Sequence, residues 1–154
     1  MNTEPRDAVE RVWREQGPKL WRSLVAFTGD PEVATDAMAE AFAQALGRGD
    51  AVREHDRWIW RSSFRIAAGE LKARGHRPGR ADESVYVMPE PIADLVQALG
   101  TLSPNQRAAA ILHDYADLPT SYVAKILGCS QATVRVHLAH ARKRLRPLLE
   151  DVDE

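Results

Sequence analysis

The amino-acid sequence predicts an all-α protein made of two small helical domains joined by a flexible linker, the second domain containing a helix-turn-helix. Three observations predict this fold class. Apolar residues recur at helical spacing along most of the chain. Residues 76–91 interrupt this pattern with several Pro and Gly residues and no helical period. Near the C-terminus, Gly128 separates a short amphipathic segment from a longer one, which is typical of a helix-turn-helix.

The composition limits the classes of protein to which the chain can belong. Its 154 residues suffice for one domain of average size or for two small ones. Hydrophobic residues make up 44% and charged residues 28%, which is ordinary for a folded protein. No apolar run is as long as a membrane span and no signal-peptide pattern is present, so we expect a cytoplasmic protein without membrane contact. The single cysteine, Cys129, excludes an internal disulfide and a cysteine-cluster zinc site.

The formal net charge of −1 hides a strong segregation of charge along the chain. Residues 57–80 carry seven basic residues and one acidic residue, and residues 130–149 carry five basic residues and no acidic one. The segments before, between and after these two basic blocks are each acidic. This pattern indicates two separate contacts with a polyanion, and other surfaces that suit a protein partner.

The first domain, residues 1–75, is predicted to contain four helices. The first spans residues 5–16 and is expected to end at Gly17–Pro18, because Pro favours the first turn of a new helix. The third follows Asp30–Pro31, an N-cap and a first-turn proline, and keeps helical spacing of its apolar residues as far as Leu46. These signals make the third helix the most secure of the four.

The outer face of this third helix carries an acidic stripe. Glu32, Asp36 and Glu40 are four residues apart, so they share one side of the helix. Such a stripe is either a solvated face or a docking surface for a basic partner.

The fourth helix, expected from Arg57 to Ala73 with Asp56 as its cap, interleaves aromatic residues with arginines. Rings that stack on unpaired bases, with cations that follow the phosphates, are how single-stranded nucleic acid is held. Alternatively, the tryptophans belong to the core. Because adjacent helical positions point about 100° apart, we expect one of Trp58 and Trp60 to be buried and the other to be at least partly exposed.

The second domain, residues 92–154, is also predicted to be helical. Ser103–Pro104 caps one of its helices. The helix-turn-helix follows, with a short helix that ends at Gly128 and a longer helix capped by Ser130. The longer helix has an apolar stripe and a basic face, which is what a reader of the DNA major groove needs. The apolar stripe consists of Val134, Leu138, Ala141, Leu145 and Leu148.

Three stretches of the chain resemble the extracytoplasmic-function (ECF) group of bacterial RNA polymerase sigma factors. They read FTGDPEVATDAMAEAFAQAL, WIWRSSFRIAAGELKAR and, after the linker, LGTLSPNQRAAAILHDYADLPTSYVAKILGCSQATVRVHLAHARKRL. Each motif is degenerate, but their order and spacing cover nearly the whole chain. The resemblance implies a protein that binds core RNA polymerase and promoter DNA and directs promoter-specific transcription initiation. It also implies control by an anti-sigma factor.

The resemblance assigns roles to individual residues. Those that match the helix binding the polymerase clamp are Asp36, Glu40 and Phe42. Those on the helix that handles the −10 promoter element are Trp58, Arg61 and Arg65. Those on or just before the helix that faces the −35 element are Ser130, Gln131, Thr133, Arg135, His137, Arg142 and Arg144. Arg135 can make a bidentate contact to guanine, while Arg142 and Arg144 can hold phosphates.

Several positions depart from the family pattern. Ala39 stands where Gln is common beside Glu40. In the −10 helix, Ser62–Ser63 replace an apolar pair, and Arg65 and Gly69 stand where Asn and Asp are common. The departure at Ala39 bears on the clamp contact, while those in the −10 helix predict an unusual −10 preference or weak melting of the promoter.

Other functions compete with this interpretation. The sequence shows no Gly-rich phosphate loop, no plausible Cys–His pair and no carboxylate pair in an apolar setting, so we predict neither an enzyme nor a cofactor. His137 and His140 could bind a metal with Cys129, but three mixed ligands around a turn are a weak signal, and we predict no metal site. A helix-turn-helix regulator that never contacts polymerase, and a protein-interaction adaptor with solvated basic faces, both stay open as alternatives.

Overall fold

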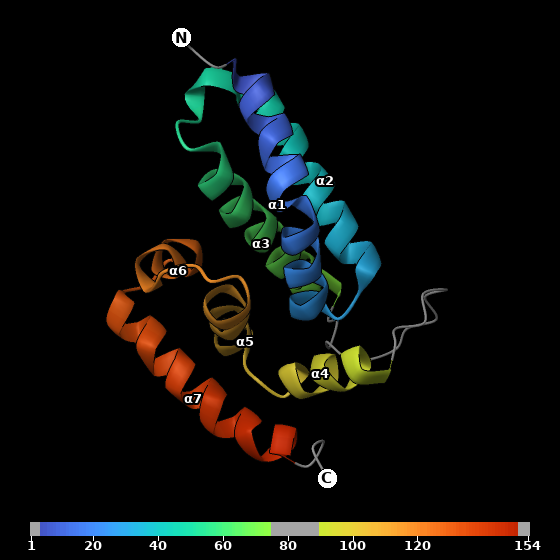
Figure 1. The fold of residues 1–154 in the computed structure, drawn as a ribbon, viewed down its shortest axis with the longest axis vertical. Helices are drawn as coiled ribbons and strands as arrows, with labels where there is room; N and C mark the ends of the chain where they lie inside the picture. The colour runs from blue at the N-terminus through green and yellow to red at the C-terminus, as the bar shows by residue number, and fades with distance from the viewer. Residues whose placement is uncertain (1–3, 75–89, 151–154) are drawn as a thin grey trace.

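The computed structural model describes residues 4–74 and 90–150, and these contain helices and turns but no β-strand. Two groups of helices are visible in Figure 1. The first group consists of α1 (Pro5–Thr28), α2 (Pro31–Arg48), the 3-10 turn η1 (Gly49–Ala51) and α3 (His55–Arg74). The second group consists of α4 (Glu90–Gly100), α5 (Pro104–Ala110), the π-helical turn η2 (Ile111–Tyr115), α6 (Thr120–Leu127) and α7 (Gln131–Glu150). The predicted all-α fold with two helical domains is confirmed, while the linker predicted at 76–91 lies outside the described residues except at its end.

The first group begins with one long helix where two were predicted. The break expected at Gly17–Pro18 is wrong, because α1 continues through both residues. Buried side chains on either side of Pro18 belong to one stripe within residues 9–28 that packs against α2 and α3. This packing outweighs the roughly 3 kcal/mol that a proline costs inside a helix. A Cβ at Gly17 would lie 3.5 Å from the Met38 methyl group, which is an ordinary contact, so the packing there does not require glycine.

The start of α2 follows the prediction. The Asp30 carboxylate accepts hydrogen bonds from the backbone N–H groups of Glu32 and Val33, at 2.9 and 3.4 Å, and Pro31 occupies the first turn. The apolar face of α2 is buried against α1 and α3. The helix is thereby fixed with its acidic stripe outward.

Helix α3 differs slightly from the prediction at its start. It begins at His55, so Asp56 lies inside the first turn instead of capping the helix. Trp60 is buried and donates a hydrogen bond from Nε1 to Oε1 of Gln16, at 2.8 Å, while Trp58 is half-buried. The expectation of one buried and one partly exposed tryptophan is confirmed.

The second group contains the predicted caps and turn. Ser103 and Gln106 form a reciprocal capping box at the start of α5. Helix α6 ends at Gly128, whose φ of 70° is left-handed. The Ser130 hydroxyl accepts a 3.1 Å hydrogen bond from the backbone N–H of Thr133 and so caps α7. The helix-turn-helix is present as predicted.

The two groups are in contact with each other. Helix α1 of the first group touches α4, α5 and η2, and α3 touches α6. The buried apolar residues of both groups form one connected cluster. The boundary between the groups therefore lies along α1 and α3, next to the residues predicted to bind the −10 element.

Candidate nucleic-acid interface

The helix-turn-helix is held rigid by contacts between its two helices. Val123 of α6 and Val134 of α7 are both completely buried. At the surface, the Thr120 hydroxyl donates a 3.2 Å hydrogen bond to Oε1 of Gln131. These contacts fix the first turn of α7 relative to α6, which is what a helix needs in order to present its side chains to a groove in one orientation.

The residues predicted to face the −35 element are not equally available. Thr133, Arg135 and Arg144 are exposed along α7, and His137 is half-buried. Ser130 caps the helix, and its hydroxyl lies 2.9 Å from that of Thr133. Among the arginines predicted to contact the −35 element, Arg135 and Arg144 extend into solvent. Neither forms an ion pair with another described residue.

Arg142 has a partner that the sequence did not indicate. Its Nη2 lies 2.8 Å from Oδ1 of Asp114 in η2, and both side chains are about half exposed. The hydrogen bond to Asp114, and then the charge of that carboxylate, raise the pKa of Arg142. A DNA phosphate would have to share Arg142 with Asp114 or replace Asp114. Arg142 is therefore held by an ion pair within the protein, whereas Arg135 and Arg144 are not.

The −10 candidates lie on α3 at the boundary between the two groups. Arg61 and Arg65 are exposed. The half-buried Trp58 has the Arg48 guanidinium over its ring, 5.4 Å from the centroid. Trp58 and Arg61 also line a pocket that is closed on its other side by Tyr122 of α6.

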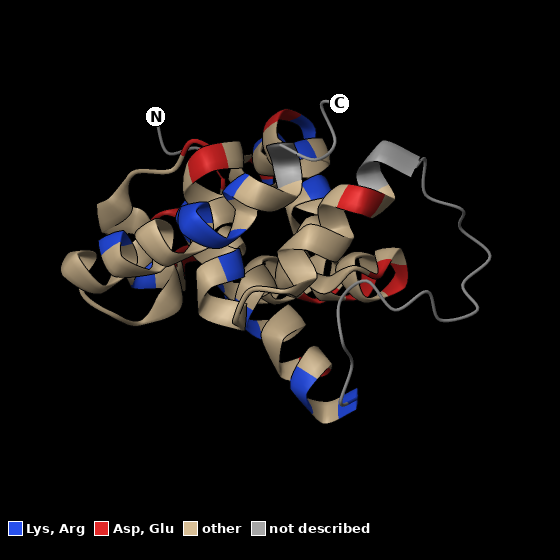
Figure 2. Cartoon of the chain, turned by 90° about the horizontal axis from the view of Figure 1, so that it is seen from below, with Lys and Arg blue, Asp and Glu red and all other residues tan. Residues whose placement is uncertain are grey.

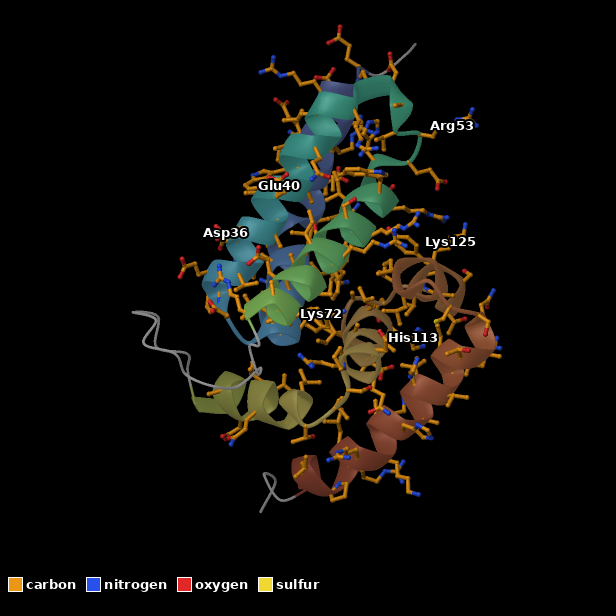
Figure 3. The ribbon with its side chains drawn as sticks, turned by 180° about the vertical axis from the view of Figure 1, so that it is seen from behind. Asp36, Glu40, Arg53, Lys72, His113 and Lys125 are labelled. Carbon is orange, nitrogen blue, oxygen red and sulfur yellow. The ribbon has the colours of Figure 1, made fainter. Side chains whose placement is uncertain are left out.

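The three residues predicted to bind the polymerase clamp differ in their exposure to solvent. Asp36 and Glu40 are exposed on α2, and Figure 3 shows them away from Arg53 and Lys125. The Gln44 amide donates a 2.9 Å hydrogen bond to the Glu40 carboxylate and orients it. Phe42, by contrast, is buried and packs edge-on against Trp13, with ring centroids 4.9 Å apart. In this arrangement Phe42 positions the helix and does not face a partner.

The basic block on α3 extends to the end of that helix. Its last turn carries Lys72 and Arg74, and this end of α3 is blue in Figure 2, where the grey trace begins. Arg74 donates a 3.1 Å hydrogen bond to Glu70 one turn earlier. Lys72 is exposed and makes no ion pair among the described residues.

Two residues at the boundary were missed by the sequence analysis. Arg107 of α5 and Tyr122 of α6 are both buried against the first group. Tyr122 had a detectable signal, because it stands beside the apolar residues of α6 at a position that is buried in the structure. Arg107 had none, since an arginine before three alanines in an amphipathic helix is usually solvated.

Neither a metal cluster nor a membrane span emerges from the part of the chain that the structure describes. There, no three His, Cys, Asp or Glu side chains come together in a way that could hold a metal ion. The helices among residues 4–74 and 90–150 are too short or too polar to cross a bilayer.

The second group of helices is similar to a known protein family. Residues 92–145, which include the helix-turn-helix, match the family model described as sigma-70, region 4. This match covers the segment in which Gly128 and Ser130 form the turn.

Curated relatives match the chain over most of its length. The RNA polymerase sigma-H factor of Pseudomonas aeruginosa is 28% identical over 86% of this chain and 83% of its own. The RNA polymerase sigma-E factor of Streptomyces avermitilis is 29% identical over 94% and 86%. The ECF RNA polymerase sigma factor SigL of Mycobacterium tuberculosis is 26% identical over 94% and 90%.

Solved structures share the fold. The sigma factor RpoE, in complex with the anti-sigma factor NepR from Bartonella quintana, superposes with a TM-score of 0.77 at 20% identity, covering 92% of this chain and 96% of its own. CnrH, in complex with the cytosolic domain of CnrY, superposes with a TM-score of 0.74 at 20% identity, covering 97% and 91%. The arrangement of helices is therefore shared by chains with very different sequences.

Proposed function

Because the chain belongs to the ECF group of RNA polymerase sigma factors, we propose that it binds core RNA polymerase and directs promoter-specific transcription initiation. The observation that carries this proposal is the helix-turn-helix within residues 92–145. It lies in a chain that matches RNA polymerase sigma factors over most of its own length and of theirs. The role is non-enzymatic, since the chain supplies contacts and the polymerase supplies the chemistry. It is exercised in the cytoplasm, where polymerase and promoter meet.

The two groups of helices divide this role. Residues 1–75 bind the polymerase clamp and hold the −10 element, residues 92–154 read the −35 element, and residues 76–91 join them. Support comes from the separate positions of an acidic stripe on α2, an aromatic and basic face on α3, and a basic face on α7.

Polymerase docking is assigned to the outer face of α2. The carboxylates of Asp36 and Glu40 are exposed and one helical turn apart, so a basic surface of the clamp can meet both. Phe42 supports this face from inside the core through its contact with Trp13.

Contact with the −10 element is assigned to α3. Trp58 offers a ring to an unpaired base, and Arg61 and Arg65 offer cations to the phosphates. Since Trp58 and Arg61 also line the pocket beneath α6, separation of the two groups would widen the access of a DNA strand to both residues.

Contact with the −35 element is assigned to α7. Thr133, Arg135 and His137 lie in the half of the helix nearest the turn and read base edges. Arg144 and, once released from Asp114, Arg142 hold phosphates farther along the helix. Ser130 and Gln131 act by fixing the start of α7.

An anti-sigma factor completes the proposed set of partners. One solved structure with this fold, RpoE with NepR, contains an anti-sigma factor, and another contains CnrH in complex with the cytosolic domain of CnrY. We infer that a regulator of the same kind holds this chain inactive by preventing the two groups from separating.

The deciding experiment is run-off transcription with purified bacterial core polymerase over a library of promoters. The expected result is transcription from a defined set of −35 and −10 sequences only when the chain is added. A pull-down of core polymerase by the chain provides the binding measurement. If the chain binds promoter DNA but not core polymerase, it is a regulator of another kind and the proposal fails.

A further inference from the structure

A pocket of about 470 Å³ lies between the two groups of helices. The first group contributes its floor and one wall, from the segment after η1 and the first two turns of α3. Helix α6 contributes the opposite wall through Tyr122 and Lys125. A volume of this size falls within the range of small-molecule sites in proteins. Because its walls come from both groups, the pocket is complete only while the groups are in contact.

The pocket gathers an excess of positive charge. Four cations line it, Arg53, Arg57, Arg61 and Lys125, against the single carboxylate of Glu54. Figure 3 shows Arg53 on the first group and Lys125 on α6 at the same side of the molecule.

Most of these cations have no counter-ion among the residues that the structure describes. Arg57 lies 3.6 Å from Glu54. Arg53, Arg61 and Lys125 form no ion pair with any of the described residues. Three exposed cations around one pocket create a positive potential there, so an anion placed among them would be favoured, most of all at low salt.

A buried hydroxyl in the same wall also lacks a partner. Tyr122 is only 7% exposed, and its Oη forms no hydrogen bond within the described part of the chain. The Arg57 guanidinium lies over the Tyr122 ring, 5.2 Å from the centroid. Burial and then the charges of Asp56 and Glu54 raise the pKa of Tyr122, while Arg57 acts in the opposite direction. The hydroxyl therefore keeps its proton and remains available as a donor.

We propose that this pocket binds a small phosphorylated ligand with at least two phosphate groups, held by Arg53, Arg57, Arg61 and Lys125. Guanidinium groups match phosphate oxygens with paired hydrogen bonds, and an ammonium adds a mobile charge. The Tyr122 ring forms part of the wall beside Arg57, so a bound ligand would lie next to an aromatic face as well as to the cations.

Such a ligand would couple binding to closure of the two groups. It contacts residues of both, so it binds the closed arrangement more tightly than an open one and shifts the population toward closure. If the function proposed above is correct, the ligand would also keep Trp58 and Arg61 from the −10 strand. The binding itself does not depend on that function.

The test is calorimetric titration of the full chain, without polymerase or promoter, at low salt. The two probes are inorganic pyrophosphate and a nucleoside diphosphate. The expected result is one site per chain, weakened about tenfold or more by Lys125→Gln, which removes one charge-assisted contact. The matched control is Lys143→Gln, the same change of charge on the exposed side of α7, and it should leave the dissociation constant within about twofold.

The outcomes separate clearly. Equal affinity for both probes means that phosphates alone are recognised, and tighter binding of the nucleotide means that the aromatic wall contributes. Either result supports the site. The proposal is overturned if neither probe binds, if Lys125→Gln binds as well as the wild type, or if Lys143→Gln weakens binding equally. Hydrogen exchange adds an independent readout, since pyrophosphate should slow exchange in residues 53–61 and 120–127 together. A failure of run-off transcription would leave all of these measurements unaffected.

Discussion

Arg107 donates a 2.7 Å hydrogen bond from Nη1 to the backbone oxygen of Phe27, joining α5 to the last turn of α1. Its guanidinium also lies over the Phe27 ring, 5.2 Å from the centroid. The side chain is only 3% exposed, and burial lowers the pKa of Arg107 to about 10, so it is still charged at neutral pH. A helix carbonyl of one group thus receives its hydrogen bond from a buried cation of the other.

Replacing Arg107 tests whether this contact holds the groups together. Arg107→Met keeps much of the aliphatic length but leaves the Phe27 carbonyl without its donor, a loss of about 1–3 kcal/mol in the closed form. Hydrogen exchange in residues 24–29 should accelerate, and the radius of gyration from X-ray scattering should rise. Arg14→Met on the exposed face of α1 is the control. Unchanged exchange in the Arg107 variant would show that other contacts suffice.

Removing the Tyr122 hydroxyl, unlike removing the Arg107 guanidinium, is predicted not to destabilise the protein. Tyr122→Phe removes a buried donor that has no acceptor, so the variant should be as stable as the wild type or more stable by about 1 kcal/mol at pH 7. Urea unfolding measures this difference. A destabilisation of more than about 1 kcal/mol would mean that the hydroxyl has a partner, such as an ordered water.

The raised pKa of Tyr122 also predicts how stability depends on pH. In the unfolded chain tyrosine ionises near pH 10, while folded Tyr122 keeps its proton to higher pH. The folded state then binds more protons, so its stability falls as the pH rises above about 10. The free-energy difference between wild type and Tyr122→Phe should change over pH 9–11 in favour of the variant. A constant difference across this range would contradict the assignment.

The pair formed by Asp114 and Arg142 predicts a change in DNA binding with little change in stability. Both side chains are about half exposed, so the pair contributes at most about 1 kcal/mol to folding. Asp114→Asn should free Arg142 for a phosphate, tightening promoter binding by the holoenzyme and steepening its salt dependence by about one unit. Asp94→Asn removes the same charge from an exposed position on α4 and serves as the control. Weaker binding by the Asp114 variant would show that the pair orients Arg142 usefully.

Arg135 is the residue expected to carry −35 specificity. Arg135→Ala should relax discrimination at one base pair by about 1–3 kcal/mol, measured by transcription from promoters with every single substitution in the −35 element. Arg144→Ala should lower transcription from all of these promoters by similar factors, because a phosphate contact carries no sequence information. If transcription by the Arg135 variant falls equally from all promoters, Arg135 contacts a DNA phosphate and not a base.

Local structure was predicted best from the sequence where a single residue determines where a helix begins or ends. Asp30, Gly128 and Ser130 act on their own helix ends, and all three do so in the structure as expected. Gly17–Pro18 failed as a predicted break because the buried stripe of α1 keeps its phase across the proline, and packing against two other helices decides the outcome.

Contacts between the two groups could not be predicted from local patterns. Arg107 and Tyr122 acquire their roles from residues that are 80 and more than 60 positions away in the chain, Phe27 and Arg57. The same holds for the ion pair of Arg142 with Asp114, which depends on how α7 crosses η2. The candidate site residues were recognised by their chemistry, but their availability is set by these long-range contacts.

The boundary between the groups has a chemistry unlike that of the interior. Besides Arg107, it contains Arg57 over Tyr122, Arg22 donating to the Tyr115 hydroxyl at 2.9 Å, and Lys19 at 3.8 Å from Asp117. When the groups separate, water can replace the partners of these cations, but apolar side chains such as Phe27 also become exposed, because the buried residues of both groups form one cluster. Separation therefore combines rehydration of cations with exposure of part of the core. A partner that binds one arrangement more tightly than the other shifts the molecule toward that arrangement.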